Sequence, residues 1–147
     1  MIDCFDAEIM ERVGAAPRLL LFLDYDGTLA DFAPTPDHVL PDPELVDLLQ
    51  RLVDLPHIRV AIISGRRLAH IQRLVPVAGI LLAGTYGVEL QLPDGASHHR
   101  LSYDEVRPPL AQVKASWSEL LQGRKGFYLE DKGWAVAIHA KDADPAE

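Results

Sequence analysis

Short apolar runs alternate with helix-like segments over the first hundred residues. Residues 19–23 read LLLFL and residues 58–63 read IRVAII, so both segments are predicted to be strands. A third, shorter strand is predicted at 80–83. The uninterrupted apolar run at 19–23 indicates a strand buried on both faces, as in a parallel sheet covered by helices.

Two helices are predicted between these strands. Residues 43–53 place apolar side chains every three or four positions, after Asp42 as a cap and a proline in the first turn. A second helix is predicted from Leu68 until Pro76 stops it. The order strand, helix, strand, helix, strand indicates an α/β fold with right-handed crossovers.

The flanking segments carry weaker patterns. Residues 1–16 are predicted to be a short helix or a loose lead-in, and three prolines keep residues 31–42 extended as a loop over the sheet edge. Residues 88–92 and 97–101 are predicted to form a hairpin, because a Pro-Asp-Gly turn lies between them.

Residues 103–147 have the pattern of a separate unit. Apolar residues from Val106 to Leu121 recur at helical spacing, and Gly123 ends the predicted helix. A second hairpin is predicted from 127 to 139, with its turn at Asp131-Lys132-Gly133. The domain prediction is therefore a core over residues 1–102 followed by a smaller helix-and-hairpin unit.

Composition narrows the class of protein. Of the 147 residues, 48% are hydrophobic and 24% are charged, which is typical of a globular chain. The net charge of −8 and the absence of a basic run argue against nucleic-acid binding. No apolar stretch is long enough to span a membrane, and acidic residues near the start argue against a signal peptide. The single cysteine, Cys4, suits a reducing compartment, so we expect a cytoplasmic location.

Two carboxylates one position apart follow the first predicted strand. Ligands of parallel sheets bind at the carboxyl ends of the strands, where Asp24 and Asp26 fall. Alternate residues of an extended chain share a side, so the two carboxylates are expected to face one volume while Tyr25 points elsewhere. Such a pair is tolerated when a cation or a shared proton reduces the repulsion. The alternative is that these residues merely end the strand, with Gly27 turning the chain.

A second chemical signal follows the next predicted strand. Ser64 and Gly65 lie at a junction of strand and helix, where a hydroxyl and free backbone N–H groups are able to bind a phosphate oxygen. Taken alone, Ser64 is better explained as an ordinary helix N-cap than as a phosphate ligand.

The segment DYDGTLA after a buried strand resembles the first motif of the haloacid dehalogenase superfamily of phosphotransferases. The resemblance implies that Asp24 is the nucleophile that forms an aspartyl-phosphate and that Asp26 is the general acid and base. It also implies Mg²⁺ bound by the carboxylate of Asp24 and the backbone carbonyl of Asp26.

The same superfamily keeps a phosphate-binding Ser or Thr in its second motif. By this resemblance Ser64, Gly65 and Thr28 are expected to bind the phosphoryl group. The string Ser-Gly-Arg is similar to that of the sugar-phosphate branch, which makes Arg66 a candidate substrate contact, with Arg67 solvated or the two roles exchanged.

Later segments resemble the trehalose-6-phosphate phosphatase family. Residues 83–90, AGTYGVEL, look like the family's G-x-E stretch, although Tyr86 stands where the family usually has His. Glu89 is either part of that motif or a solvated sheet residue. Residues 129–139, LEDKGWAVAIH, resemble the family's cap motif. That match implies three sugar contacts, which are Glu130, Lys132 and His139. The alternative is a solvated hairpin tip for Glu130 and Lys132 and a surface position for His139.

The resemblance predicts an α/β fold, namely a haloacid dehalogenase-like Rossmannoid parallel sheet forming a partial core, followed by part of a small α/β cap domain. The expected function is Mg²⁺-dependent hydrolysis of a sugar phosphate, foremost trehalose 6-phosphate. Sucrose-phosphate or mannosylglycerate-phosphate hydrolysis and a catalytically incomplete binding fragment remain open. The superfamily's later Lys and Asp pair have no match here, so we expect the chain alone to be incomplete. The oligomeric state is left open.

Overall fold

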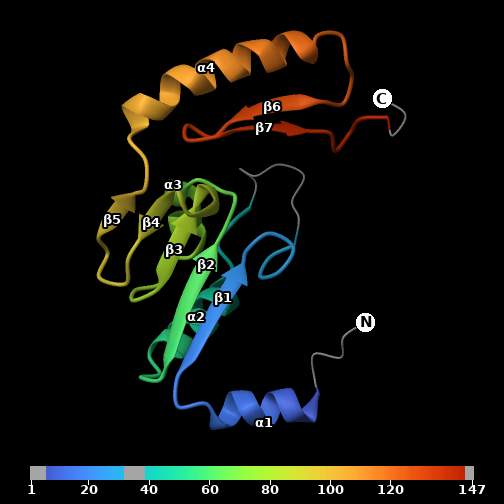
Figure 1. Cartoon of the computed structure of the whole chain (residues 1–147). Helices are drawn as coiled ribbons and strands as arrows, with labels where there is room; N and C mark the ends of the chain where they lie inside the picture. Colours follow the sequence, from blue (N-terminus) through green and yellow to red (C-terminus); the bar gives the residue numbers. More distant parts are fainter. Residues whose placement is uncertain (1–5, 32–38, 145–147) are drawn as a thin grey trace.

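A mixed five-stranded sheet forms the centre of the computed structural model, which describes residues 6–31 and 39–144 (Figure 1). The strands lie in sequence order and are β1 (Leu19–Asp24), β2 (Ile58–Ile63), β3 (Leu81–Gly84), β4 (Glu89–Gln91) and β5 (Ser97–His99). Strands β1, β2 and β3 are parallel, which confirms the predicted α/β core. Strands β4 and β5 add an antiparallel hairpin, as its turn residues predicted.

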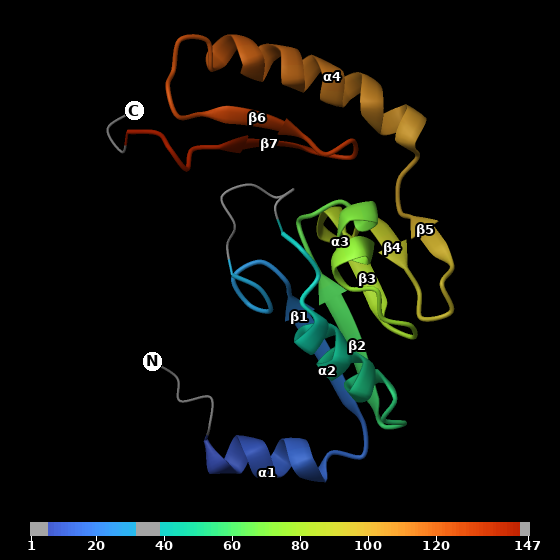
Figure 2. The same ribbon diagram turned by 180° about the vertical axis from the view of Figure 1, so that it is seen from behind.

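Helices α2 (Pro43–Val53) and α3 (Leu68–Leu74) cover one face of this sheet (Figure 2). Helix α2 begins where predicted, because a side-chain oxygen of Asp42 accepts the N–H of Glu44 at 2.9 Å. The hydrophobic core lies between these helices and the sheet, and it is built from apolar side chains that are essentially inaccessible, including Leu49, Ile62, Ile71, Ile80 and Leu82.

The other face of β1 is not buried as predicted. Leu20 is 63% exposed and Phe22 is 67% exposed, whereas Leu19, Leu21 and Leu23 pack against the core. Within the described residues β1 pairs only with β2, and both helices lie on the opposite face. One face of β1 therefore packs against the core, and the other face is an exposed apolar surface.

The N-terminal segment forms helix α1 (Ala7–Ala15), capped by the side chain of Asp6, in agreement with the predicted short helix. The helix lies at the end of the sheet away from the second unit (Figure 1). Most of the predicted extended loop falls on residues 32–38, which lie outside the described residues. No helix among residues 6–31 and 39–144 is both long and apolar enough to cross a membrane.

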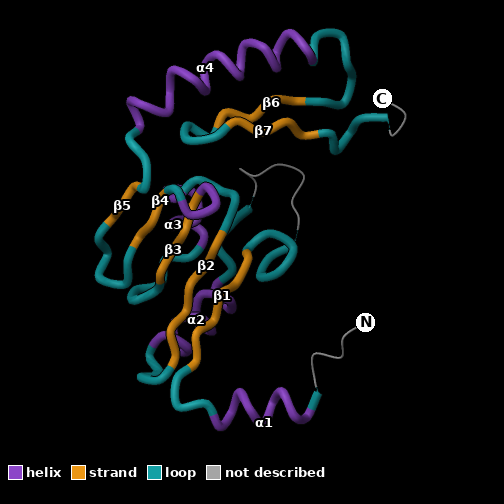
Figure 3. The backbone as a smooth tube through the Cα atoms, in the orientation of Figure 1, coloured by secondary structure: helices purple, strands orange, loops and turns teal. Residues whose placement is uncertain are grey.

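A helix and a hairpin form the second unit. They are α4 (Tyr103–Leu120), β6 (Tyr128–Asp131) and β7 (Val136–His139). The half-buried side of α4 includes Val106, Val113 and Trp117, which matches the predicted amphipathic spacing. The hairpin lies on the side of α4 that faces the core (Figures 1 and 3), so the tip of the hairpin approaches the strand ends.

Candidate active site

The chain makes a tight turn directly after β1. Strand β1 ends at Asp24, which is exposed, and the next residue, Tyr25, is fully buried. The two side chains therefore point to opposite sides, as the alternation of an extended chain predicted. The carbonyl of Tyr25 accepts the N–H groups of Leu29 and Ala30, each at 3.0 Å. Gly27 turns the chain with a φ of 80°, a conformation that glycine adopts without steric cost. The turn therefore leaves Asp24 at the strand end and Asp26 in the loop that follows.

The backbone of Thr28 and the hydroxyl of Tyr25 differ in their surroundings within this turn. The N–H of Thr28 donates to the carbonyl of Tyr25 at 3.4 Å, while the Thr28 residue is exposed. The hydroxyl of Tyr25 is buried with no hydrogen-bond partner among the described residues, and burial raises the pKa of that hydroxyl. The predicted phosphate contact through Thr28 stays a prediction.

Ser64 lies beside the acidic turn. In the parallel register of β1 and β2, Asp24 is opposite Ile63, so Ser64 directly follows the pair. The residue is 1% exposed, and its Oγ accepts the N–H of Arg66 at 3.1 Å. Helix α3 has Arg67 at its N-cap position, so Ser64 is not the N-cap of that helix. A hydroxyl that accepts from the backbone still has its own proton to donate.

Arg66 contacts the second acidic residue directly. Its Nε donates to both carboxylate oxygens of Asp26, at 3.1 and 2.9 Å, and its Nη2 donates to Oδ1 at 2.6 Å. The guanidinium also lies 5.8 Å from the ring centroid of Tyr25 and 3.3 Å from His70. The prediction assigned Arg66 to substrate, and it did not anticipate this ion pair. The structure therefore joins the first two sequence motifs through side chains.

The turn after β3 is anchored by a buried carboxylate. Glu89 is 6% exposed, and its Oε2 accepts the hydroxyl of Thr85 at 2.7 Å and the N–H of Leu68 at 3.2 Å. The solvated alternative for Glu89 is therefore wrong. Because Leu68 begins α3, Glu89 ties this turn to the helix that follows the Ser64 loop.

The three predicted sugar contacts lie together on the hairpin. Glu130 accepts from His139 Nε2 at 2.7 Å, and its Oε2 is 3.5 Å from Lys132 Nζ. Lys132 Nζ also donates to the backbone carbonyl of Gly65 at 2.9 Å. The ring of Tyr128 stacks on His139 with 4.4 Å between centroids. The solvated-tip alternative is wrong for Lys132, whose side chain is 10% exposed and contacts the core.

A carboxylate that the sequence reasoning missed holds the hairpin to α4. Asp131 accepts from Arg107 Nη1 at 2.9 Å, from Lys114 Nζ at 3.0 Å and from the N–H of Gly133 at 2.9 Å. The hydrogen bond from Arg107 and the others hold the pKa of Asp131 well below its usual range. The sequence offers an acidic residue in the turn and a preceding helix that carries Arg and Lys, but this pattern does not specify which side chains pair.

The donor set for a metal ion is small in the described residues. Carboxylate and carbonyl oxygens are the ligands that Mg²⁺ prefers, and the exposed Asp24 offers them. The carboxylate of Asp26 is engaged by Arg66, and no group of three metal-ligating side chains occurs among residues 6–31 and 39–144. The described residues fit Mg²⁺ in ligand type but do not form a complete site.

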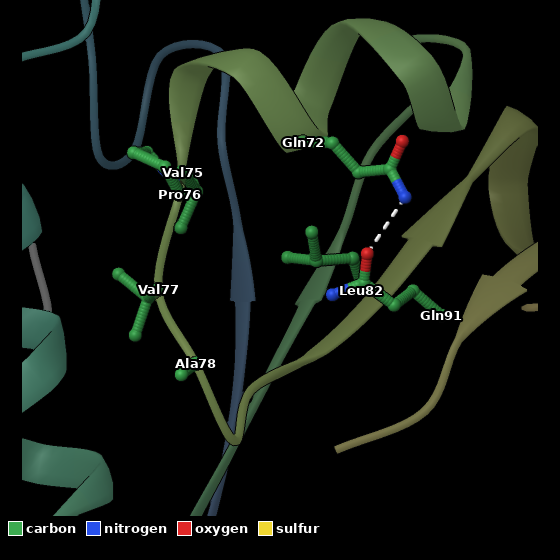
Figure 4. Close-up of a pocket in the computed structure, with 7 residues that line it drawn as sticks. All are labelled: Gln72, Val75, Pro76, Val77, Ala78, Leu82 and Gln91. Carbon is green, nitrogen blue, oxygen red and sulfur yellow. Dashed lines mark hydrogen bonds between the residues drawn. The ribbon is translucent and has the colours of Figure 1, made fainter. Parts of the chain in front are cut away.

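A separate hollow lies between α3 and β4 (Figure 4). Its polar part is a pair of amides, with Gln72 Nε2 donating to Gln91 Oε1 at 2.6 Å. The rest of the lining consists of Val75, Pro76, Val77, Ala78 and Leu82. None of the predicted site residues lines this hollow, so it is distinct from the acidic turn and the Ser64 loop.

Comparison with known proteins gives consistent matches. The model of the family described as trehalose-phosphatase matches residues 22–147. The chain is 37% identical over 127 residues to the trehalose-phosphate phosphatase of Mycobacterium ulcerans, a match that covers 86% of this chain and 32% of the relative. It is 35% identical over 141 residues to that of Mycobacterium bovis, with 92% and 36% covered. The chain spans about a third of the length of these curated relatives.

The fold has a match among solved structures. The C-terminal domain of trehalose-6-phosphate phosphatase from C. albicans superposes with a TM-score of 0.77 at 22% sequence identity. That superposition covers 95% of this chain and 48% of the solved chain. At this identity the likeness establishes the α/β fold and its helix-and-hairpin unit.

Proposed function

The chain belongs to the trehalose-phosphatase family, and from that premise we propose that the whole protein hydrolyses a sugar phosphate, foremost trehalose 6-phosphate, to the free sugar and phosphate. The observation that carries the proposal is the contact between Lys132 Nζ and the Gly65 carbonyl at 2.9 Å. The contact places Lys132, one of the predicted sugar contacts of the hairpin, against residues 64–66, the predicted phosphate loop of the core. A site for a sugar phosphate requires both halves in one place.

The chemistry assigned to the acidic turn has two steps. The carboxylate of Asp24 attacks phosphorus, the bond from phosphorus to the sugar oxygen breaks, and Asp26 transfers a proton to that oxygen. Asp26 then accepts a proton from water, and the water oxygen attacks phosphorus. The bond from phosphorus to the Asp24 oxygen breaks, which releases phosphate and regenerates the carboxylate of Asp24. The position of Asp24 at the carboxyl end of a parallel strand supports this role. The ion pair with Arg66 orients the carboxylate of Asp26.

Phosphate binding is assigned to the loop after β2. The hydroxyl of Ser64, the backbone of Gly65 and Thr28 are the proposed contacts to the phosphoryl oxygens. Mg²⁺, held by the carboxylate of Asp24 and the carbonyl of Asp26, would neutralise negative charge between carboxylate and phosphate. Because the described ligand set is small, we expect this chain by itself to bind Mg²⁺ weakly and to be inactive or nearly so.

Sugar recognition is assigned to a cap formed by residues 103–147, with residues 1–102 as the core. Glu130 accepts hydrogen bonds from sugar hydroxyls, Lys132 donates them, and His139 does either. A core that recognises phosphate alone has no means to distinguish one sugar from another, so discrimination depends on these cap groups. The single cysteine supports a reducing, cytoplasmic location.

The test compares substrates in the whole protein. Assays with Mg²⁺ against trehalose 6-phosphate, sucrose 6-phosphate, mannosylglycerate phosphate and a small aryl phosphate are expected to favour trehalose 6-phosphate. Glu130→Ala is expected to raise KM for the sugar phosphate about tenfold or more and to leave the aryl phosphate nearly unchanged. The matched control is Glu119→Ala, on an exposed position of α4. Equal losses on both substrates for Glu130→Ala would contradict sugar recognition by the hairpin.

A further inference from the structure

Two adjacent residues after β3 have a strained backbone. Thr85 and Tyr86 have φ values of 46° and 55°, and they are the only non-glycine residues with positive φ in the described part of the chain. Residues other than glycine or asparagine rarely adopt this conformation, because their Cβ atom comes too close to the following carbonyl oxygen. Tyr86 is also 75% exposed, so burial of its ring does not compensate the strain. Strain of this kind persists where surrounding contacts enforce it, and it frequently marks a functional position.

Two backbone hydrogen bonds join this strained turn to the predicted phosphate loop, which consists of Ser64, Gly65 and Arg66. The N–H of Tyr86 donates to the carbonyl of Ser64 at 3.0 Å, and the N–H of Thr85 donates to the carbonyl of Arg66 at 2.7 Å. The side chain of Thr85 is fixed in turn by Glu89. The turn is therefore bonded to both sides of Gly65, and it projects the ring of Tyr86 over that residue.

The ring of Tyr86 contacts the loop and the cap at once. A Cβ built on Gly65 would lie 2.6 Å from Cζ and Oη of Tyr86, so the tip of the ring covers Gly65 at contact distance. The ammonium of Lys132 lies 5.7 Å from the centroid of the same ring and donates to the Gly65 carbonyl at 2.9 Å. An aromatic face within about 6 Å attracts an ammonium ion. The core thus presents two adjacent acceptors, a carbonyl and a ring, to one cap lysine.

We infer that Tyr86 is a positioning residue that holds Lys132 on the phosphate loop and thereby holds the hairpin of β6 and β7 against that loop. The inference rests on the proposed function, because it explains how a sugar contact of the cap is aligned with a phosphate loop of the core. If the turn served only to connect β3 with β4, glycine at position 86 would form it with less strain, and the exposed ring would have no effect on Lys132.

The test measures how fast Lys132 is acetylated in the 147-residue chain. A water-soluble acetylating ester is applied, and peptide mass spectrometry gives the rate at Lys132 relative to the exposed Lys125. Three variants are compared. Tyr86→Phe keeps the ring; Tyr86→Gly and Tyr86→Asn remove it but keep a residue that tolerates positive φ. We expect the relative rate at Lys132 to rise about threefold or more in the Gly and Asn variants and to stay unchanged in the Phe variant.

The melting temperature separates positioning from folding. Because Gly relieves the strain, Tyr86→Gly is expected to melt at the same temperature as the natural chain or higher. An unchanged rate at Lys132 in both ring-less variants would overturn the inference, and so would a rise in the Gly variant alone, which would reflect a flexible turn. The readout needs no turnover. If the rate at Lys132 is unchanged while the whole protein still hydrolyses a sugar phosphate, only the role of Tyr86 is contradicted. If the rate at Lys132 rises but the whole protein hydrolyses no sugar phosphate, only the proposed function is contradicted.

Discussion

Arg66 Nη2 lies 2.6 Å from Asp26 Oδ1, and Arg66 Nε lies 2.9 Å from Asp26 Oδ2, although 40 residues separate the two along the chain. The side chain of Arg66 is 9% exposed and that of Asp26 is 27% exposed, so the pair is partly withdrawn from water. The planar guanidinium contacts both carboxylate oxygens and so fixes the plane of the carboxylate as well as its position.

Replacing Arg66 with Lys keeps the charge and removes this planar contact. In the whole protein, Arg66→Lys is expected to lower kcat for the sugar phosphate about tenfold or more, because Asp26 is no longer held in one orientation. Steady-state kinetics checks this. The matched control is Arg67→Lys, since Arg67 is the exposed neighbour. Similar kinetics for the two variants would show that the contact with Asp26 does not matter for turnover.

The role of Asp26 as proton donor predicts a dependence on the leaving group. Asp26→Asn is expected to slow hydrolysis of a sugar phosphate far more than that of an activated aryl phosphate, because only the sugar alkoxide needs a proton to leave. The measurement compares kcat/KM of the variant and the natural protein for phosphate esters whose leaving groups differ in pKa. The loss in the variant is expected to grow as the pKa of the leaving group rises. A loss of the same size on every ester would assign Asp26 to positioning alone.

The anchor at Asp131 predicts an acid-sensitive cap. Its pKa in the folded chain is below its usual value, so its stabilising contribution is complete above the unfolded pKa of about 4 and is lost as pH falls below that value. Both tryptophans, Trp117 and Trp134, lie in the second unit, so intrinsic fluorescence reports on this unit. We expect the fluorescence to change between about pH 5 and about pH 2 in the natural chain, and Asp131→Asn to have a lower melting temperature at neutral pH with a weaker acid dependence.

The control for this prediction is Asp47→Asn. Asp47 is 72% exposed at its side chain and forms a surface pair with Arg51 at 3.8 Å. Surface pairs of this kind contribute little to stability. If Asp47→Asn and Asp131→Asn shift the melting temperature equally, the three contacts to Asp131 do not hold the hairpin to α4.

The buried hydroxyl of Tyr25 predicts a neutral or stabilising substitution. Because this hydroxyl has no partner among the described residues, Tyr25→Phe is expected to leave the free energy of unfolding unchanged or to raise it by up to about 1 kcal/mol. Urea unfolding followed by circular dichroism measures the difference. A loss of more than about 1 kcal/mol would mean that the hydroxyl makes a hydrogen bond worth keeping.

The helices and strands were predictable because their periodicity is strong and local. Helix α2 begins at Pro43, as Asp42 and the apolar spacing predicted, and β2 has the predicted bounds. The prediction for β1 was wrong on one face, because an apolar run does not reveal whether a neighbouring strand or helix covers it. The hairpin of β6 and β7 was also predictable, because its two strands flank a turn at Asp131-Lys132-Gly133.

Long-range polar contacts were not predictable from the sequence. The pair of Arg66 and Asp26 depends on where two loops meet after the sheet has formed. The burial of Glu89 depends on a left-handed turn at Thr85, and no local pattern of polar residues signals that turn. The family motifs assign the chemistry to the acidic turn, the loop after β2 and the hairpin, and the three-dimensional packing decides which side chains of these segments contact one another.

Identifying the residue that is phosphorylated during turnover tests the role of Asp24 as the nucleophile. The whole protein is mixed with trehalose 6-phosphate and Mg²⁺, quenched in acid within one turnover and treated with borohydride, which reduces an aspartyl-phosphate to homoserine. We expect homoserine at position 24 in the natural protein and none in Asp24→Asn. Homoserine at another position, or sustained hydrolysis with no modified residue, would contradict the assignment of Asp24 as the nucleophile.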